Sequence, residues 1–187
     1  MDFRFSEHFL QALEQARDEA LRTGRRGILP DHVTLGILRL DGSPASEILR
    51  RLGLDPAELK RQLDDALFQP QAIPWQERES ILPCESTVSM MQHAAIEARR
   101  CGSALIEPLH FLLACTRVSG NRTHDWLQQH GISLQQLVEA SGLDWDRYGL
   151  DKSASAPDIS APDPALMASA IEKRLLEGYT TTNPLAS

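Results

Sequence analysis

Two histidines are the residues of this sequence whose type and spacing most suggest chemistry. His32 and His110 follow P-D and P-L, and each stands where a helix is expected to begin. An imidazole can bind a metal ion or transfer protons near neutral pH. In the first turn of a helix it can also hydrogen-bond the nearby chain and fill space between helices. We favour this structural role for both histidines.

Motifs of catalysis are missing from the sequence. A phosphate-binding P-loop needs Gly-Lys-Ser/Thr, but Lys60, Lys152 and Lys173 follow Leu, Asp and Glu. The sequence also contains no G-x-S-x-G nucleophile elbow and no H-E-x-x-H pair. We therefore expect no enzyme activity, no catalytic residue, no cofactor and no metal site.

Charge and composition narrow the class of protein further. The net charge of −7 repels phosphate backbones, so we expect no nucleic-acid partner. The cysteines are odd in number and have no C-x-x-C spacing, which indicates reduced thiols; they are Cys84, Cys101 and Cys115. The first residues are charged from Asp2 onward, and no stretch approaches membrane-spanning length. We expect a cytoplasmic protein without a membrane partner, and the sequence does not indicate its oligomeric state.

The segments that carry these residues occur twice. Matching residues recur at one offset of 78 (for example 110 − 32 = 78), and no gap interrupts the register. The matched pairs are Ala16/Ala94, Glu19/Glu97, Ala20/Ala98, Gly24/Gly102, Ile28/Ile106, Pro30/Pro108, His32/His110, Leu35/Leu113, Leu49/Leu127, Gly53/Gly131 and Leu59/Leu137. One register held over this length predicts two copies of one structural unit.

The hydrophobic pattern of each copy predicts four helices. In the first copy, N-cap and proline signals place helix starts at Ser6, Pro30, Pro44 and Asp55. Apolar residues three and four positions apart follow these signals, and the second copy repeats the pattern from about Glu85. We therefore expect an all-α fold of two tandem four-helix repeats related by pseudo-two-fold symmetry, at residues 1–68 and 83–142.

Two segments lie outside these repeats. Residues 69–82 contain two prolines and predict an extended connector, with Trp75 packed across the two repeats. Residues 143–164 predict a linker that ends in low-complexity Ser/Ala/Pro/Asp sequence.

Residues 165–187 predict a tail with one short helix, at about residues 165–177. Its apolar side contains Leu166, Ile171 and Leu175. A helix of this length is marginal alone in water. We therefore expect it to dock on the repeats, in the same chain or in another copy.

The repeated pattern resembles the Clp R repeat of the N-terminal domain of Clp-type ATPase chaperones. The resemblance rests on F-S-E at the first helix start, E-A-L-R-T-G at its end, I-L-P-D-H-V-T-L-G-I-L, and I-L-R-R-L-G-L-D. It runs from Phe5 to about Ser141 and implies a Clp N-domain-like fold, here as a stand-alone protein without AAA+ modules.

The resemblance implies a binding domain, because family members hold adaptors or substrates and pass them to an unfolding ring. Some members recognise a phosphorylated arginine through a helix-start hydroxyl and the acidic residue before the His. Ser6 and Asp31 match these types in the first copy, and the second copy has Cys84 and Leu109 instead. The candidate ligand- or partner-binding residues are Ser6, Asp31, His32, Cys84, Leu109 and His110.

The favoured function is that of a non-catalytic protein-binding module. It would be an accessory or adaptor-like protein, or a substrate receptor, associated with Clp-type chaperone or protease machinery. The expected partners are a substrate, an adaptor, or a Clp ATPase or protease subunit. The alternative is a helical DNA-binding regulator, because four short helices can imitate helix-turn-helix spacing, although the acidic charge disfavours it.

Overall fold

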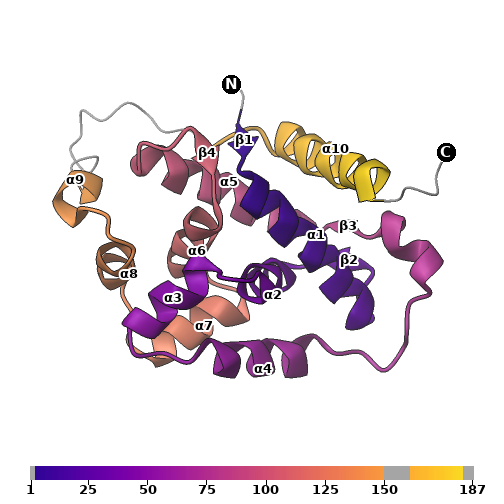
Figure 1. Ribbon diagram of the computed structural model, residues 1–187, viewed down its shortest axis with the longest axis horizontal. Coiled ribbons are helices and arrows are strands. Elements are labelled where there is room, and N and C mark those ends of the chain that lie inside the picture. The colour runs from indigo at the N-terminus through magenta and orange to yellow at the C-terminus, as the bar shows by residue number, and fades with distance from the viewer. Residues whose placement is uncertain (1–2, 150–160, 183–187) are drawn as a thin grey trace.

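The structure is a computed structural model that describes residues 3–149 and 161–182. Two sets of four helices follow one another along the chain (Figure 1). All four helices of each set begin at residues offset by 78 (85 − 7, 108 − 30, 122 − 44 and 134 − 56). Repeat 1 has α1 (Glu7–Arg22), α2 (Pro30–Arg39), α3 (Pro44–Arg51) and α4 (Pro56–Leu67), and repeat 2 has α5 (Glu85–Arg100), α6 (Pro108–Arg117), α7 (Arg122–Gln129) and α8 (Leu134–Ala140). The prediction of an all-α fold is confirmed.

Two short parallel strand pairs connect the repeats, and the sequence analysis did not predict them. β1 (Arg4–Phe5) pairs with β4 (Leu105–Ile106), and β2 (Gly27–Ile28) pairs with β3 (Leu82–Pro83). Each pair joins the strand before the first helix of one repeat to the strand before the second helix of the other. The entrance to each repeat is therefore built partly from its neighbour.

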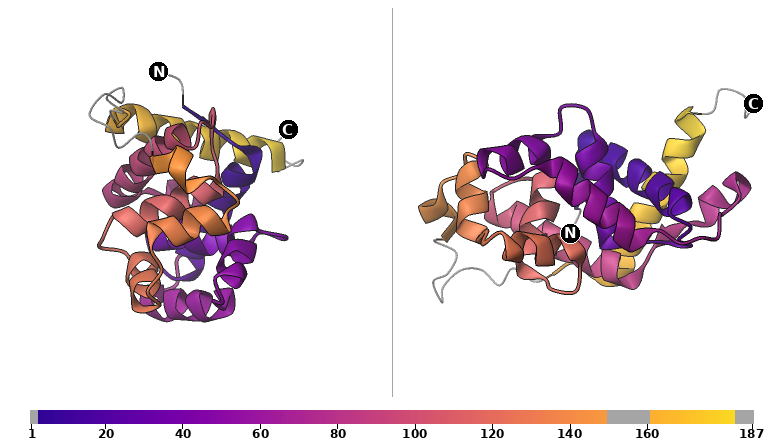
Figure 2. Two further views of the ribbon diagram at one scale, coloured as in Figure 1. Left: turned by 90° about the vertical axis from the view of Figure 1, so that its left-hand side faces the viewer. Right: turned by 90° about the horizontal axis from the view of Figure 1, so that it is seen from below.

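A single hydrophobic core runs through both repeats. The central helix α2 is buried from Pro30 through Leu38, as its nearly continuous apolar sequence requires. Phe9 of α1 meets Phe111 of α6 with ring centroids 6.0 Å apart. The end-on and bottom views show the helices of the two repeats packed as one body (Figure 2).

Close packing of α1 on α2 depends on Gly36. A Cβ atom at this position would lie 2.2 Å from the carbonyl oxygen of Ala12 and 2.9 Å from the backbone nitrogen of Ala16. The equivalent position in repeat 2 is Ala114, so α5 and α6 accommodate a methyl group that α1 and α2 exclude.

The connector between the repeats is less extended than predicted. It contains a 3₁₀ helix, η1 (Trp75–Ser80), and ends in β3. Trp75 is 63% exposed and packs beneath the Arg78 guanidinium, 5.4 Å from the ring centroid. The prediction that Trp75 packs across the two repeats is therefore wrong, because Arg78, anchored to Glu14 and Asp18 of α1, provides its contact instead.

The segment predicted to be a linker, residues 143–164, contains a further helix, α9 (Trp145–Gly149). Tyr148 of α9 is buried, so this part of the segment packs on repeat 2. Most of the low-complexity sequence, residues 150–160, lies outside the described residues.

The tail helix α10 (Pro164–Thr182) is longer than predicted and docks within the same chain. It lies along α1 and α5 and also contacts β3, at the top of Figure 1. Met167, Ile171 and Leu175 are buried, whereas Leu166, expected on the apolar side, is 61% exposed. None of the helices in the described part of the chain is long and apolar enough to cross a membrane.

Candidate partner-binding site

The starts of α1 and α5 are equivalent positions with different side chains. The Ser6 hydroxyl accepts a hydrogen bond from the Phe9 N–H at 3.1 Å, which caps α1. Cys84 makes no such side-chain bond at the start of α5. Both residues are half-buried.

The crossed strands place each of these helix starts against the opposite repeat. The Ser6 N–H donates to the Ile106 carbonyl at 3.0 Å, and the Cys84 N–H donates to the Ile28 carbonyl at 3.0 Å. Ser6 therefore neighbours the segment that leads to Leu109 and His110, and Cys84 neighbours the segment that leads to Asp31. The resemblance implied one pocket holding Ser6 and Asp31, but no hydrogen bond joins them within the described residues.

Asp31 is buried at the start of α2 and caps a helix of the other repeat. Its carboxylate accepts hydrogen bonds from the Arg122 N–H at 3.1 Å, the Thr123 N–H at 3.3 Å and the Thr123 hydroxyl at 3.2 Å. Burial raises the pKa of Asp31, and these bonds to the start of α7 oppose the rise. A guanidinium ligand would have to compete with α7 for this carboxylate.

The equivalent interface, in which α6 of repeat 2 meets α3 of repeat 1, is apolar at these positions. Leu109 stands in the place of Asp31, and Ala45 stands in the place of Thr123, since both pairs are offset by 78 (109 − 31, 123 − 45). α6 packs on α3 there, and Leu109 is partly buried against the core. The positions that hold the polar pair Asp31 and Thr123 in one interface thus hold apolar residues in the other.

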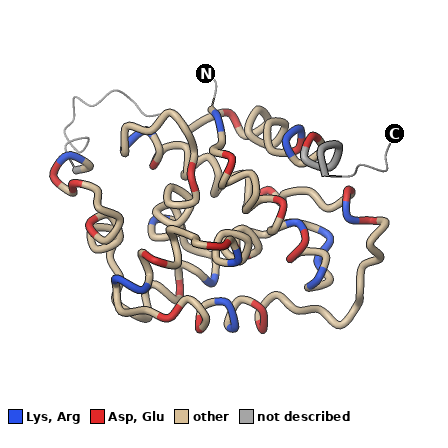
Figure 3. The backbone as a smooth tube through the Cα atoms, in the orientation of Figure 1, with Lys and Arg blue, Asp and Glu red and all other residues tan. Residues whose placement is uncertain are grey.

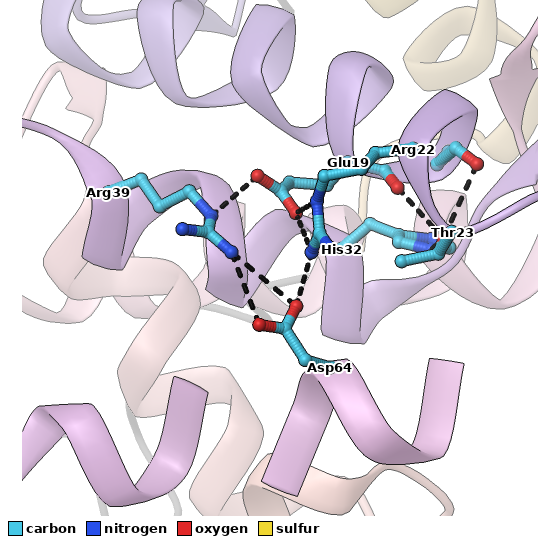
Figure 4. Close-up of polar contacts among 7 residues, drawn as sticks. Glu19, Arg22, Thr23, His32, Arg39 and Asp64 are labelled. Atoms are coloured by element: carbon cyan, nitrogen blue, oxygen red, sulfur yellow. Dashed lines mark hydrogen bonds and ion pairs between the residues drawn. The ribbon is translucent and has the colours of Figure 1, made fainter. Parts of the chain in front are cut away.

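Both ring nitrogens of His32 make hydrogen bonds inside repeat 1, and Figure 4 shows this residue beside Thr23. Its Nδ1 accepts from the Leu29 N–H at 2.9 Å, and its Nε2 lies 3.0 Å from the Thr23 hydroxyl oxygen. Burial first, then the charges of Arg25 and Arg22, lower its pKa to about 4. The residue is therefore neutral at physiological pH and serves as a helix cap.

His110 makes the same Nδ1 hydrogen bond as His32 but lacks the hydroxyl partner among the described residues. Its Nδ1 accepts from the Glu107 N–H at 3.0 Å, and burial lowers its pKa to about 4. Cys101 stands where repeat 1 has Thr23, and the described part of the chain shows no hydrogen bond between Cys101 and His110. Across residues 3–149 and 161–182, no group of His, Cys, Asp and Glu side chains could hold a metal ion.

A buried glutamate with two arginines recurs in both repeats, and the sequence analysis missed it. Glu19 binds Arg22 (Nε–Oε2 2.9 Å) and Arg39 (Nε–Oε1 2.5 Å), and both arginines also pair with Asp64 of α4 (Figure 4). The offset of 78 relates Glu19, Arg22 and Arg39 to Glu97, Arg100 and Arg117, so the signal was present in the sequence.

The repeat 2 cluster differs in its fourth member. Glu97 binds Arg100 (Nη1–Oε1 2.8 Å), Arg117 (Nε–Oε1 2.7 Å) and the Tyr148 hydroxyl of α9, which donates to it. Burial raises the pKa of Glu97, and the two arginines oppose the rise. A hollow of about 570 Å³ opens beside this cluster, and its lining includes Arg99, Arg100, Cys101, Asp144, Arg147 and Tyr148.

Comparisons with known proteins agree with this architecture. The family model described as the Clp repeat (R) N-terminal domain matches residues 4–130. The solved N-terminal domain of the caseinolytic protease associated chaperone ClpD from Arabidopsis thaliana has the same fold, with a TM-score of 0.54 at 18% identity. The match covers 74% of this chain and 94% of that domain.

Two curated bacterial proteins are also similar to the chain. The chaperone protein ClpB of Oceanobacillus iheyensis is 25% identical over 182 residues, which are 92% of this chain and 22% of ClpB. The negative regulator of genetic competence ClpC/MecB of Bacillus subtilis is 25% identical over 165 residues, covering 84% of this chain and 20% of that protein. The chain thus spans about a fifth of the length of these relatives, and it belongs to the Clp repeat (R) N-terminal domain family.

Proposed function

We propose that this chain is a non-catalytic receptor for protein partners of Clp-type chaperone or protease machinery, acting as an adaptor-like accessory or as a substrate receptor. The Clp N-terminal domain is a protein-interaction module of Clp ATPases, and the match to it over residues 4–130 is the observation that carries the proposal. The absence of Gly-Lys-Ser/Thr from the sequence supports the lack of P-loop ATPase activity.

The distribution of charge supports a protein partner over nucleic acid. The net charge is −7, and basic and acidic residues are interspersed along the described backbone rather than gathered on separate faces (Figure 3). Duplex binding draws affinity from clustered Lys and Arg that replace condensed counterions. The DNA-binding alternative therefore has no basic stripe to support it among the described residues.

The candidate residues from the sequence differ in how well they support a role in binding. Asp31, His32 and His110 are buried, and the hydrogen bonds above engage their carboxylate oxygens or ring nitrogens with the protein's own chain. Ser6, Cys84 and Leu109 are half-buried. We propose that the buried three position the repeats and that partners contact other parts of the domain.

Binding of purified components tests the proposal. The full chain would be labelled and titrated with a reduced, carboxymethylated polypeptide that cannot fold, with a Clp ATPase hexamer, and with random duplex DNA at low salt. We expect a dissociation constant on the order of micromolar for at least one of the two protein probes. Duplex DNA should not be retarded, and ATP turnover should not exceed a buffer blank. Retardation of DNA without binding of either protein probe would favour the regulator instead.

A further inference from the structure

The tail helix α10 covers a face of the repeat domain at which the two repeats meet. Its contacts fall on α1 of repeat 1, on α5 of repeat 2, and on β3 between them. We call this surface the α10-binding face. Met167, Ile171 and Leu175 are spaced four residues apart, and each is at most 1% exposed. The face therefore accepts an amphipathic helix with apolar residues at positions i, i+4 and i+8.

One charged residue of this face, Arg17, is only partly hydrogen-bonded when α10 is docked. Arg17 of α1 is fully buried, and its Nη2 donates to the backbone carbonyl of Leu175 at 2.8 Å. The same Nη2 also contacts the Glu14 carboxylate, 3.0 Å away. Its Nε and Nη1 have no hydrogen-bond partner among the described residues. A guanidinium in a dry site favours a carboxylate that can accept from two nitrogens at once.

The described part of helix α10 places no carboxylate of its own next to Arg17. α10 presents only a main-chain carbonyl to Arg17, and that leaves buried donors unpaired at a cost to the docked state. The match to the family model ends at residue 130, so α10 lies outside it.

We propose that the α10-binding face is a site for an amphipathic helix of a partner protein that carries a carboxylate opposite Arg17, and that α10 is a built-in competitor for this site. The inference rests on the proposed function, because it specifies the chemistry of the partner of a protein-binding module. The carboxylate would occupy the place of the Leu175 carbonyl and pair with the free side of the guanidinium. The partner helix then gains a charged contact that α10 lacks.

Peptides that differ only at that point provide the probe. The sequence of residues 163–175 would be synthesised with a fluorophore at its N-terminus, once with a free C-terminal carboxylate on Leu175 and once amidated. Asp163 is kept because its side chain accepts from the Ala165 and Leu166 N–H groups and caps the helix. The peptides would be titrated into full-length protein that carries Ile171→Lys, which removes a buried anchor of α10. The matched control is Leu176→Lys, because Leu176 is 53% exposed on the same helix.

We expect Ile171→Lys to bind the carboxylate peptide about tenfold more tightly than the amide, since hydrogen bonds to charged groups are the stronger ones. Arg17→Met combined with Ile171→Lys should bind the two peptides equally. Wild type and Leu176→Lys should bind both at least tenfold more weakly, because α10 occupies the face. Equal affinity of Ile171→Lys for both peptides, or equal affinities of Ile171→Lys and Leu176→Lys, would overturn the proposal. So would a dimer of Ile171→Lys in which α10 exchanges between copies.

A second measurement decides the matter if Ile171→Lys perturbs the repeats. Arg17→Met alone removes the incompletely paired cation and should slow hydrogen exchange of the α10 amides at least severalfold. Faster exchange would mean that Arg17 holds α10 in place, which contradicts the proposal. A chain that binds the unfolded polypeptide but fails both of these tests would keep the proposed function and lose only this inference.

Discussion

The two repeats begin all four helices at equivalent positions but end the fourth helix differently. In repeat 1, α4 continues to Leu67 and brings Asp64 to the Glu19 cluster. In repeat 2, α8 ends at Ala140, and Tyr148 of α9 completes the Glu97 cluster. The glutamate and the two arginines of each cluster are common to both repeats. The fourth residue is not, because it comes from α4 in repeat 1 and from α9 in repeat 2. The hollow lies between the end of α5 and the residues that follow α8.

The largest expected effect is the loss of folding stability at acidic pH, to which His32 and His110 both contribute. Both pKa values are lowered to about 4, so the unfolded chain takes up protons between pH 6.5 and 4 that the folded chain excludes. Stability is therefore full above about pH 6.5 and falls as the pH drops toward 4, by roughly 2–3 kcal/mol for each histidine. The raised pKa values of Asp31 and Glu97 act in the opposite direction, because the folded chain binds those protons more tightly.

Asparagine at either histidine position keeps an oxygen near the place of Nδ1 and removes the titration. His32→Asn and His110→Asn should each reduce the slope of unfolding free energy with pH by about 1 kcal/mol per unit between pH 6 and 5. Urea unfolding at several pH values measures this slope. An unchanged slope in either variant would show that the corresponding histidine does not resist protonation.

The second prediction exchanges the polar interface for its apolar counterpart. Asp31→Leu should destabilise the fold by about 2–3 kcal/mol, because the Arg122 and Thr123 N–H groups lose their acceptor, while the Thr123 hydroxyl keeps Thr34 as a partner. Asp31→Leu combined with Thr123→Ala reproduces the Leu109 and Ala45 pair of the equivalent interface. The double variant should recover only a minor part of that loss, because the backbone N–H groups of Arg122 and Thr123 still lack the carboxylate, whereas the equivalent interface has Pro44 in the place of Arg122. Additive losses in chemical unfolding would show that the two interfaces are not interchangeable.

The third prediction concerns the contact between the first two helices of each repeat. Gly36→Ala should cost about 1–3 kcal/mol, because the added methyl group meets the Ala12 backbone. Ala114→Gly should cost about 1 kcal/mol through backbone entropy. Thermal unfolding of both variants ranks them, and a neutral Gly36→Ala would mean that α1 and α2 can separate at little cost.

The smallest expected effect is a gain. Cys101→Thr would give His110 the hydroxyl partner that Thr23 gives His32 at 3.0 Å. The variant should be more stable by about 0.5–1 kcal/mol. The reverse change, Thr23→Cys, should lose a similar amount. Chemical unfolding at pH 7 measures both, and a destabilised Cys101→Thr would show that repeat 2 lacks room for the hydroxyl.

The sequence predicted the helices of the repeats well because they follow from apolar spacing, caps and one constant offset. It could not predict the strand pairs, since two-residue strands carry no periodic signal and their partners are distant in sequence. The contact of Asp31 with Thr123 is likewise set by tertiary packing across 92 residues. The Glu19 and Glu97 clusters were predictable, because their arginines recur at the same offset. Tyr148 was not, because α9 has no counterpart in repeat 1.

NMR chemical-shift mapping tests the central claim most directly, which is that the buried helix-start residues serve the fold while a partner helix binds the α10-binding face. Full-length Ile171→Lys would be titrated with the carboxylate peptide of residues 163–175. The account predicts that amide shifts concentrate on α1 and α5 around Arg17. The largest shifts at Asp31, His32 and His110 would contradict it, because those residues would then form the binding site rather than support it.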